Sequence, residues 1–365
     1  MKIVEIIPQL SSGGAERFVV DLCNELSLRH EVTLIVYHGL AEHGFYAGEV
    51  SERVNLISLE KKNGFSAVFF RKVYDAVKRA EPDVVHLHTR ALNYAFPLVW
   101  MKQRPAMFMT IHNDAEREAG GFFGTMLRKS CFARKAIVPV TISRESAASF
   151  RRFYGSDAPM IFNGRNVDSG ITPSPSVEDE FAKYRKTPDT RVLVSLARFT
   201  DVKRQDMLAR TVARLENEGY DVCALLIGRQ HDPAVVEGVL AAGSANVHML
   251  GEKTNPLEYL CLADAFCLCS LYEGMPISLI EAMGMGVIPV CTPAGGVADV
   301  VDGQIGFLSD DLSEDAYYSA LKRYLDTDQN TLADMRKRLL KTYELYGMSE
   351  CASRYESLFK EKKNG

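Results

Sequence analysis

Two glutamates, Glu273 and Glu281, stand in the sequence with seven residues between them. An apolar run of strand length, 265–270, precedes the pair, and a Gly-Met-Pro turn, 274–276, follows the first glutamate. An apolar run of helical character then extends over 277–283. The segment therefore predicts a strand, a tight loop and a helix, with one carboxylate in the loop and one in the helix.

The N-terminus of such a helix presents unpaired backbone N–H groups and the positive end of a dipole, which suit a phosphate. Pro276 is compatible with the first turn, because no intrahelical hydrogen bond there requires its N–H. Glu281 would lie one to two turns into the helix, and Glu273 at the mouth of the loop. Two carboxylates around an anion site indicate a sugar nucleotide as the ligand.

Two cations, Arg198 and Lys203, flank a loop that follows the strand-like run 191–197. An arginine fork and a lysine point charge at the carboxyl end of a strand would form a diphosphate clamp. The alternative is a pair of solvated surface charges. The expected position of Glu273 in the same cleft favours the clamp.

Glycines mark three further strand ends. Gly13 and Gly14 follow the first predicted strand, where they allow a tight turn and the close approach of a ligand. They do not form the G-x-G-x-x-G fingerprint, which argues against an NAD dehydrogenase. Gly228, and Gly251 with Lys253, end strands in the second half and could admit a nucleotide base. A simple turn is the alternative at each position.

Three histidines end or occupy strands in the first half. His112 ends the run 106–112, where its ring could donate a hydrogen bond to a substrate hydroxyl; a satisfied surface histidine is equally compatible with this position. His86 and His88 share a strand face and could bind a metal. Because the sequence indicates no third ligand, packing or hydrogen-bond acceptance is the prediction for them.

Composition limits the class of protein. A chain of 365 residues with 47% apolar residues can build two cores, and a net charge of −4 argues against a nucleic-acid binder. No apolar run approaches the roughly 20 residues that cross a bilayer, and the start is too short in apolar residues for a signal peptide. The eight cysteines include no C-x-x-C pair, so we expect buried thiols in a cytoplasmic protein.

Apolar runs of strand length alternate with helical stretches, which predicts an α/β fold with parallel sheets covered by helices on both faces. A Pro-, Ser- and acid-rich stretch, 172–180, interrupts the alternation and suggests a linker or a surface excursion. The predicted strands are 3–8, 32–37, 54–59, 83–88, 106–112, 136–141, 160–163, 191–197, 223–227, 247–250, 265–270, 287–291 and 305–308. The predicted organisation is a domain at 1–170, a linker at 171–190, a domain at 191–345 and a C-terminal helix within 346–365.

A stretch of mixed aromatic and basic residues covers 121–152. It includes Arg128, Lys129, Arg134 and Lys135. Such a segment can lie on an anionic membrane surface, on the inner face of the membrane for a cytoplasmic protein. An amphipathic helix with a solvated face is the favoured alternative.

With these residues in place, the chain resembles the retaining glycosyltransferases of family GT4. The resemblance covers essentially the whole chain and is strongest over 263–286, which contains both glutamates and a Glu-Ala-Met-Gly-Met-Gly run. Ala197 and Arg204 depart from it, because the family often has glycine at these two positions. The resemblance implies the GT-B fold: two Rossmann-like, doubly wound domains facing across a cleft, with a C-terminal helix that crosses back to the first domain.

The resemblance also implies roles for particular side chains. Glu281 would bind the ribose of the nucleotide, and Glu273 would face the donor sugar on its reacting side. Arg198 and Lys203 would neutralise the diphosphate leaving group, so that neither a metal nor another cofactor is required. His112 would contact the donor sugar. Further substrate contacts would come from Gly13, Gly14, Gly228, Gly251, Lys253, Gly274, Met275, Pro276 and Ile277.

The activity that follows is transfer of a hexose or N-acetylhexosamine from a nucleoside-diphosphate sugar, with retained configuration. A UDP-sugar is the leading donor, ahead of GDP-mannose. The acceptor would be a carbohydrate or a lipid-linked saccharide in the synthesis of a capsule, an exopolysaccharide or an O-antigen. A sugar-nucleotide epimerase of the same fold, or a catalytically silent sugar-nucleotide-binding protein, is the alternative.

Overall fold

The computed structural model describes residues 1–101 and 104–364, and these fall into two compact units. The first unit comprises Met1–Arg165 together with the chain from Tyr346 onward, and the second comprises Asn166–Leu345. Each unit contains a six-stranded sheet whose paired strands run parallel. The parallel α/β architecture predicted from the sequence is therefore confirmed.

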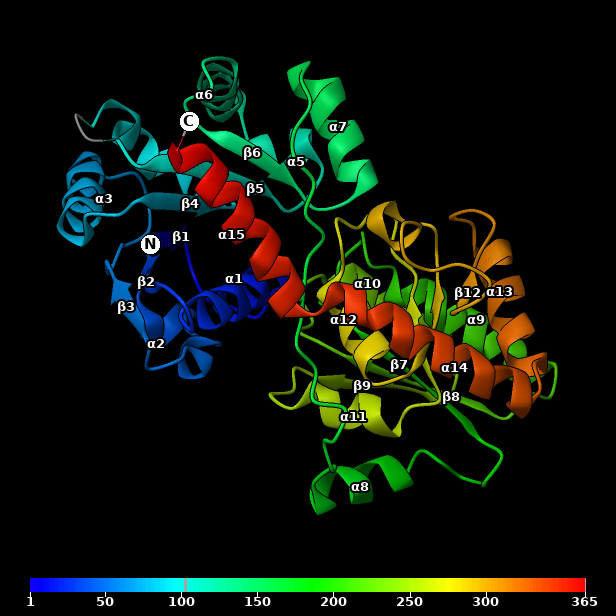
Figure 1. Cartoon of the computed structure of the whole chain (residues 1–365). Helices are drawn as coiled ribbons and strands as arrows, with labels where there is room; N and C mark the ends of the chain where they lie inside the picture. Colours follow the sequence, from blue (N-terminus) through cyan, green and yellow to red (C-terminus); the bar gives the residue numbers. More distant parts are fainter. Residues whose placement is uncertain (102–103, 365) are drawn as a thin grey trace. The chain divides into compact units, whose positions relative to one another are not determined.

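The sheet of the first unit has the strand order β3-β2-β1-β4-β5-β6 (Figure 1). Its strands are β1 (Lys2–Ile7), β2 (Glu31–Val36), β3 (Val54–Ser58), β4 (Val84–His88), β5 (Ala106–Ile111) and β6 (Val138–Thr141). Its helices are α1 (Gly14–Leu26), α2 (Leu40–His43), α3 (Ala67–Ala80), α4 (Leu92–Ala95), α5 (Ala115–Ala119), α6 (Phe122–Ala133), α7 (Arg144–Tyr154) and α15 (Met348–Asn364).

The two faces of this sheet differ in character. Because successive strand residues point to opposite faces, Val85 and Leu87 of β4 join an apolar core with residues of α3, α4, α6 and α7. His86 and His88 point to the other face, which is covered by α1 and α15. In Figure 1, α15 (red) runs across β4 and β5. Val85 and Leu87 of β4 therefore face an apolar core, whereas the opposite face of the same strand contains buried polar side chains.

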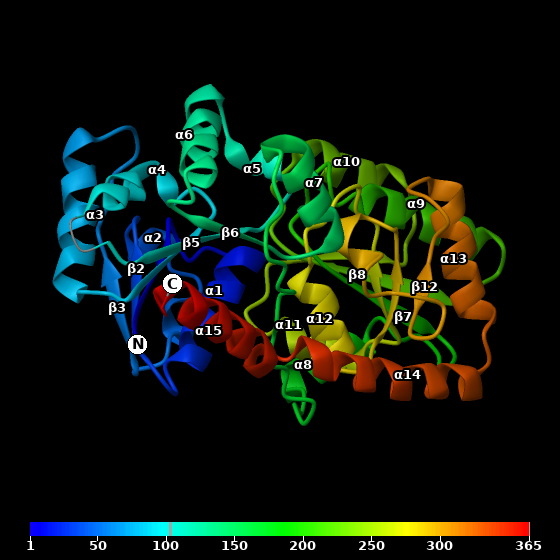
Figure 2. The same cartoon turned by 45° about the horizontal axis from the view of Figure 1, so that its top comes forward.

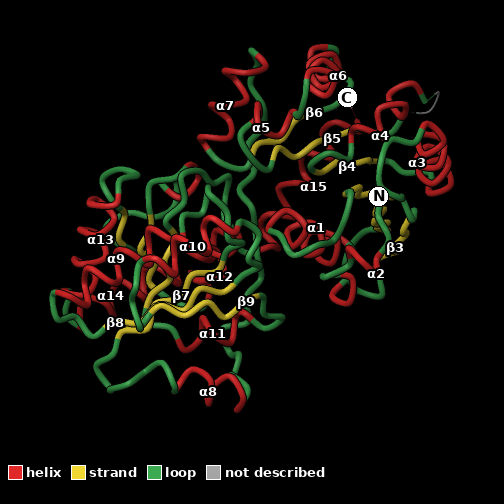
Figure 3. The backbone as a smooth tube through the Cα atoms, turned by 180° about the vertical axis from the view of Figure 1, so that it is seen from behind, coloured by secondary structure: helices red, strands yellow, loops and turns green. Residues whose placement is uncertain are grey.

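The sheet of the second unit has the order β12-β11-β10-β7-β8-β9. Figure 3 shows its strands in yellow, with β7, β8 and β9 labelled. Its strands are β7 (Arg191–Leu196), β8 (Val222–Ile227), β9 (Val247–Gly251), β10 (Ala265–Leu268), β11 (Ile288–Cys291) and β12 (Phe307–Leu308). Its helices are α8 (Pro175–Ala182), α9 (Gln205–Asn217), α10 (Pro233–Ala241), α11 (Pro256–Leu262), α12 (Ile277–Gly284), α13 (Glu314–Asp326) and α14 (Gln329–Tyr343), with α14 alongside α12 (Figure 2). Counted within each unit, both sheets have the order 3-2-1-4-5-6, which is the Rossmann arrangement.

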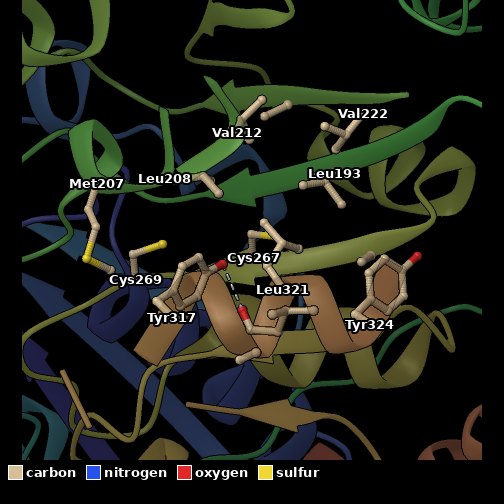
Figure 4. Packing of buried hydrophobic residues seen from close by; sticks show 14 of the residues in the cluster. Leu193, Met207, Leu208, Val212, Val222, Cys267, Cys269, Tyr317, Leu321 and Tyr324 are labelled. Atoms are coloured by element: carbon tan, nitrogen blue, oxygen red, sulfur yellow. Dashed lines mark hydrogen bonds between the residues drawn. The ribbon is translucent and has the colours of Figure 1, made fainter. Parts of the chain in front are cut away.

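The core of the second unit contains the predicted buried thiols. Cys267 and Cys269 pack with Met207 of α9 and Tyr317 of α13 (Figure 4). The Tyr317 hydroxyl donates to the Val290 carbonyl at 3.2 Å. Burial raises the pKa of both thiols, so they are inert apolar side chains. All eight cysteines lie in the described residues and none forms a disulfide.

The structure differs from the sequence-based expectation at two segments. Residues 160–163 do not form a strand, because only Met160 pairs, through an isolated bridge to Thr141. The stretch 172–180 is not an extended linker, because Pro175 begins helix α8 and Val177 and Phe181 are buried within the second unit. The units divide at Arg165 and Asn166. Within residues 1–101 and 104–364, no helix has both the length and the apolarity to cross a bilayer.

Candidate active site

The predicted site residues of the second unit lie where strands β7 to β11 end. Because the strands are parallel, their carboxyl ends share one edge of the sheet, and hydrogen bonds join the loops that follow. The amide of Ala197 donates to the Ile227 carbonyl at 3.1 Å, and that of Gly228 donates to the Gly251 carbonyl at 2.8 Å. The amide of Leu271 donates to Val202 at 2.8 Å. The loops that the sequence predicts to bind a ligand thus lie together at one edge of the sheet within one unit.

Lys203 and Glu273 meet at this edge. The Nζ atom of Lys203 lies 2.5 Å from Oε1 of Glu273, and the hydroxyl of Ser270 donates to the same oxygen at 2.5 Å. The carboxylate is buried, with a side-chain exposure of 7%, whereas the lysine side chain retains 26%. A buried carboxylate needs such partners to remain charged. The lysine therefore both neutralises Glu273 and presents a cation at the loop surface.

Helix α12 begins directly after this loop, close to the predicted start. Pro276 is its N-cap residue, and its side chain has no atom that could accept a hydrogen bond from the first turn. Gly274, Met275 and Ile277 are buried around the turn. Glu281 lies one turn further on and is also buried. The helix start therefore keeps donors that can receive an anion.

A second loop supports the Glu273 turn from behind. The amide of Gly296 donates to the Glu273 carbonyl at 3.3 Å. A Cβ atom on Gly295, which has φ +55°, would lie 1.9 Å from that carbonyl oxygen. Only glycine fits there. Gly295 and Gly296 therefore fix the position of the Glu273 backbone.

The loop 197–204 exposes the other cation. Arg198 is exposed, and its guanidinium makes no ion pair with any residue in the described ranges. Gln205 Nε2 holds the loop by donating to the Arg198 carbonyl at 3.0 Å. Arg204 has φ +52°, in the left-handed region that glycine adopts without cost, which explains why glycine suits this position. Its Nη1 donates to the Leu312 carbonyl at 2.5 Å.

Two of the remaining predicted contacts have mainly structural surroundings. Gly228 has φ +153°, and a Cβ atom there would lie 2.0 Å from the Ala197 carbonyl oxygen, so this glycine permits the close packing of two loops. Lys253 Nζ pairs with Glu180 of α8 at 3.1 Å and lies 5.3 Å from the Tyr259 ring centroid. Among the described residues, no ion pair joins Lys253 to Glu273, the partner of Lys203.

In the first unit, the predicted residues also follow strand ends. Gly13 is the N-cap residue of α1 and Gly14 its first residue, and the amide of Arg17 donates to the Gly13 carbonyl at 3.0 Å. A Cβ atom on Gly13 would lie 2.4 Å from the Glu16 carboxylate. His112 follows β5 and is 6% exposed, and its amide donates to Glu118 at 2.7 Å. It is a buried histidine, not a surface one.

His112 belongs to a buried hydrogen-bonded network. Its Nε2 lies 3.0 Å from Nδ1 of His88, and Nε2 of His88 lies 2.7 Å from Oε2 of Glu5. Nδ1 of His86 lies 2.9 Å from the same carboxylate oxygen. Glu5 is the third polar partner that the sequence did not reveal for the two histidines. Glu5, His86 and His88 form a compact cluster with potential metal-ligand atoms.

The charge of this cluster resides on Glu5. Burial alone would raise the pKa of Glu5, but the rings of His86 and His88 hold it down at about 2. Burial, followed by the nearby His86, lowers the pKa of His88 to about 4 despite the carboxylate. Burial, followed by the other two rings, lowers the pKa of His112 well below its usual value. The cluster therefore holds one carboxylate, and His88 and His112 are neutral rings.

Sequence reasoning missed Glu5, Ser270 and Gln205. For Glu5 a signal was present, because a carboxylate interrupts the apolar run Ile-Val-Glu-Ile-Ile of the first strand. A buried charge requires a partner, so its position alone indicated a polar network. The roles of Ser270 and Gln205 depend on hydrogen bonds with neighbouring loops, and no pattern in the sequence indicates those bonds.

Comparison with known proteins agrees with this geometry. The model of the glycosyl transferases group 1 family matches residues 176–342, and that of Glycosyltransferase Family 4 matches residues 12–194. The chain therefore belongs to glycosyltransferase family 4, and it is a glycosyltransferase. The family resemblance noted in the sequence is confirmed.

Curated relatives match the chain along nearly its full length. A Campylobacter jejuni enzyme that bears the name GalNAc-alpha-(1->4)-GalNAc-alpha-(1->3)-diNAcBac-PP-undecaprenol alpha-1,4-N-acetyl-D-galactosaminyltransferase is 24% identical, with 96% of each chain covered. N-acetyl-alpha-D-glucosaminyl L-malate synthase of Bacillus anthracis is 25% identical, with 97% of each chain covered.

Solved structures show the same fold. Anabaena HepE in complex with UDP and glucose superposes with a TM-score of 0.81 at 18% identity, and 99% of each chain is covered. A Rickettsia africae glycosyltransferase superposes with a TM-score of 0.82 at 18% identity, covering 99% of this chain and 98% of that one. These neighbours are GT-B glycosyltransferases, and the two Rossmann-like sheets described above are those of the GT-B fold.

Proposed function

We propose that this glycosyltransferase moves a hexose or N-acetylhexosamine from a UDP-sugar to a hydroxyl acceptor in cell-surface polysaccharide synthesis, with retention of configuration. The observation that carries the proposal is the Lys203–Glu273 pair at the start of α12, with Arg198 on the neighbouring loop. A cation pair beside a helix N-terminus suits a diphosphate, and a buried carboxylate beside it suits sugar hydroxyls.

The reaction proceeds in this proposal by attack of the acceptor hydroxyl on the face from which the nucleoside diphosphate departs. Arg198 and Lys203 stabilise the negative charge that develops on the leaving phosphate, and the phosphate accepts the proton of the acceptor hydroxyl. Glu273 orients the sugar, and Glu281 binds the ribose. No metal or other cofactor takes part in these steps.

The choice of donor rests on the relatives. One is named as an N-acetylgalactosaminyltransferase, one is named as an N-acetyl-glucosaminyl malate synthase, and HepE was solved with UDP and glucose. A thermal-shift comparison of UDP, GDP and their hexose and N-acetylhexosamine conjugates tests this choice, because a ligand that binds the folded state raises the melting temperature. We expect the UDP series to stabilise the wild type, and Glu281→Gln to lose the effect.

The matched control is Glu237→Gln, a carboxylate on α10, which should leave the shift unchanged. Stabilisation by GDP conjugates alone would contradict the UDP assignment. Labelled donor incubated without acceptor distinguishes the proposal from its alternatives. Conversion to an epimer would indicate an epimerase. Binding of the donor without hydrolysis, together with no transfer once acceptors are added, would indicate a silent binding protein.

We further propose that the acceptor is lipid-linked and that the first unit contacts the membrane peripherally. The α6 surface, defined as Phe122, Phe123 and Met126, exposes 73%, 86% and 55% of these side chains, and Lys129 lies on the same helix. The C. jejuni relative is named for an undecaprenol-linked acceptor. Arg128, however, is buried and donates to the Ala119 and Thr89 carbonyls, so it is not part of a basic face.

Co-sedimentation with vesicles tests the membrane contact. We expect binding to vesicles with anionic lipid, weaker binding to neutral ones, and loss of binding in a Phe122→Ser, Phe123→Ser variant. Phe65→Ser, an equally exposed aromatic change on the loop before α3, is the control. Equal binding by both variants would contradict a role for the α6 surface.

A further inference from the structure

One ring nitrogen of His112 faces outward from the buried network. Nε2 of this ring is engaged with His88, at 3.0 Å. Nδ1 has no hydrogen-bond partner among the described residues, and it is not among their fully enclosed polar atoms. It is therefore the atom through which His112 can meet a ligand, and whether it carries a proton decides what it can bind.

The hydrogen bonds that link His112 to His88 and His88 to Glu5 determine which nitrogen of His112 carries the proton. The carboxylate of Glu5 can only accept, so Nε2 of His88 must carry the hydrogen that bridges their 2.7 Å contact. A neutral His88 then has a bare Nδ1, which can only accept from Nε2–H of His112. A neutral His112 that donates from Nε2 has a bare Nδ1. Each contact determines the next.

The other branch of the network is compatible with this order. Nδ1 of His86 faces the Glu5 carboxylate, and its Nε2 lies 2.8 Å from Oγ1 of Thr110. That hydroxyl in turn lies 2.8 Å from the hydroxyl of Tyr355 on α15. Hydroxyl groups can donate or accept, so this branch adjusts to either state of His86 and places no constraint on His112.

A metal ion at Glu5, His86 and His88 fits the geometry less well. Ligands of tetrahedral zinc at about 2.1 Å from the ion stand roughly 3.4 Å apart. Here the His88 and His86 nitrogens lie 2.7 and 2.9 Å from the carboxylate oxygen, which are hydrogen-bond distances. Both ring nitrogens thus lie at hydrogen-bond distance from Oε2 of Glu5, so we interpret the cluster as a proton-ordering network.

We propose that Glu5 and His88 are positioning residues that hold His112 in the Nε2–H tautomer, so that its outward Nδ1 accepts a hydrogen bond from a sugar hydroxyl. This inference rests on the proposed function, which supplies the sugar. It reverses the direction expected from the sequence, in which the ring donates. A substrate whose contacted hydroxyl is replaced by hydrogen or a methyl ether, neither of which can donate, is expected to react poorly.

Nitrogen NMR of the histidine side chains tests the tautomer without any substrate. Protein labelled with ¹⁵N-histidine is compared with a His112→Asn sample, which identifies the His112 signals among those of the eight histidines. We expect a protonated Nε2 and a bare Nδ1 at neutral pH. A protonated Nδ1, whether in the other tautomer or in a charged ring, would overturn the proposal.

Three variants separate proton ordering from simple packing. His88→Phe keeps an aromatic ring but removes the acceptor, so the His112 signals should change to the other tautomer or to a mixture. His88→Gln restores the order, because its amide can donate to Glu5 while its oxygen accepts from His112, and the wild-type pattern should return. Thr110→Val alters only the His86 branch and should leave the pattern unchanged. If His88→Phe also keeps the wild-type pattern, His88 does not order the ring.

Measurements of turnover then test whether the tautomer of His112 affects how the enzyme uses its substrate. We expect His88→Phe to lower kcat/KM on the order of 10- to 100-fold, and His88→Gln to recover most of the loss. Among mono-deoxy and methyl-ether donor analogues, one position should be strongly discriminated by the wild type and weakly by His88→Phe. Unchanged discrimination in a folded His88→Phe variant would overturn the link. Absence of transfer with every donor would contradict the proposed function, while the NMR result would still decide the tautomer.

Discussion

The two units of this glycosyltransferase share one topology but use it for different chemistry. In both sheets the strand order reverses between the first and the fourth strand, at β1 and β4 in one unit and at β7 and β10 in the other. Ligands of such sheets bind outside the carboxyl ends of the strands at this switch point. In both units, the polar groups described above gather around it.

The units differ in where the charge lies. In the second unit, Lys203 and Glu273 sit in loops beyond the strand ends, and the lysine is partly exposed. In the first unit, Glu5 lies within a strand and is fully buried, and the least buried member of its network is the neutral ring of His112. Exposed loop charges suit a diphosphate, whereas a neutral ring held by a buried charge suits an uncharged hydroxyl. The shared topology places both groups of polar residues at the ends of the strands, and the units differ in how deeply the charge is buried.

Of the changes that test this difference between the units, removing both cations of the second unit should have the largest effect, a loss of turnover. Arg198→Ala with Lys203→Ala is expected to lower turnover at least 10²- to 10³-fold, because the leaving diphosphate loses its charge stabilisation. Lys337→Ala, an exposed cation on α14, serves as the control and should have little effect. Steady-state kinetics with the stabilising donor measures both. If the double variant keeps its full turnover, Arg198 and Lys203 do not stabilise the leaving diphosphate, and the role proposed for the second unit is wrong.

The close packing of the loops in the second unit predicts a large effect on stability. Gly228→Ala places a Cβ atom against the Ala197 carbonyl and strains a backbone with φ +153°, which should cost about 4 kcal/mol of unfolding free energy. Gly243→Ala, at φ +71° with open space around it, should cost only about 1 kcal/mol. Urea unfolding of the two variants gives the difference, and equal losses would refute the packing argument.

The buried rings of the first unit predict a dependence of stability on pH. The pKa of His88 is about 4 in the folded chain, against 6.5 when unperturbed, so acidification protonates the unfolded state first and lowers stability. Between about pH 7 and about pH 4.5, His88→Gln should gain about 2.5 kcal/mol relative to wild type. Burial raises the pKa of Glu118 to about 7, which acts in the opposite direction but equally in both proteins.

Unfolding in this experiment is monitored by the fluorescence of Trp100, because Trp100 is the single tryptophan of the chain and lies in the first unit. The difference between the two proteins, measured by urea unfolding at each pH, isolates the His88 contribution. A difference that does not change with pH would mean that folding leaves the pKa of His88 at its ordinary value, contrary to this prediction.

The smallest expected effect concerns the loop that carries the cations. Arg204→Gly relieves the left-handed backbone, whereas Arg204→Ala keeps the strain, and both lose the hydrogen bond to Leu312. Arg204→Gly should therefore be the more stable of the two by about 1 kcal/mol. Thermal unfolding of both variants compares them. If Arg204→Ala is the more stable, the loop does not hold this conformation in solution.

The local pattern of the sequence predicted much of the fold and part of the site. The helix expected at 277–283 is α12 at Ile277–Gly284, and the strand expected at 54–59 is β3 at Val54–Ser58. The prediction of a strand at 160–163 was wrong, because an apolar run forms a strand only where it pairs with the edge of a sheet. Here only Met160 pairs, with Thr141. The expected linker failed because Val177 and Phe181, two side chains among many polar ones, were enough to bury a short helix.

By itself, the sequence determined the parallel α/β class and the strand–loop–helix unit around Glu273, because periodicity, glycine and proline act on neighbouring residues. Only the tertiary structure decided that Lys203 meets Glu273 and that Glu5 meets His88, across separations of 70 and 83 residues. Such contacts follow from the order and register of the parallel strands. Those depend on how distant apolar faces bury one another, which no short stretch of sequence encodes.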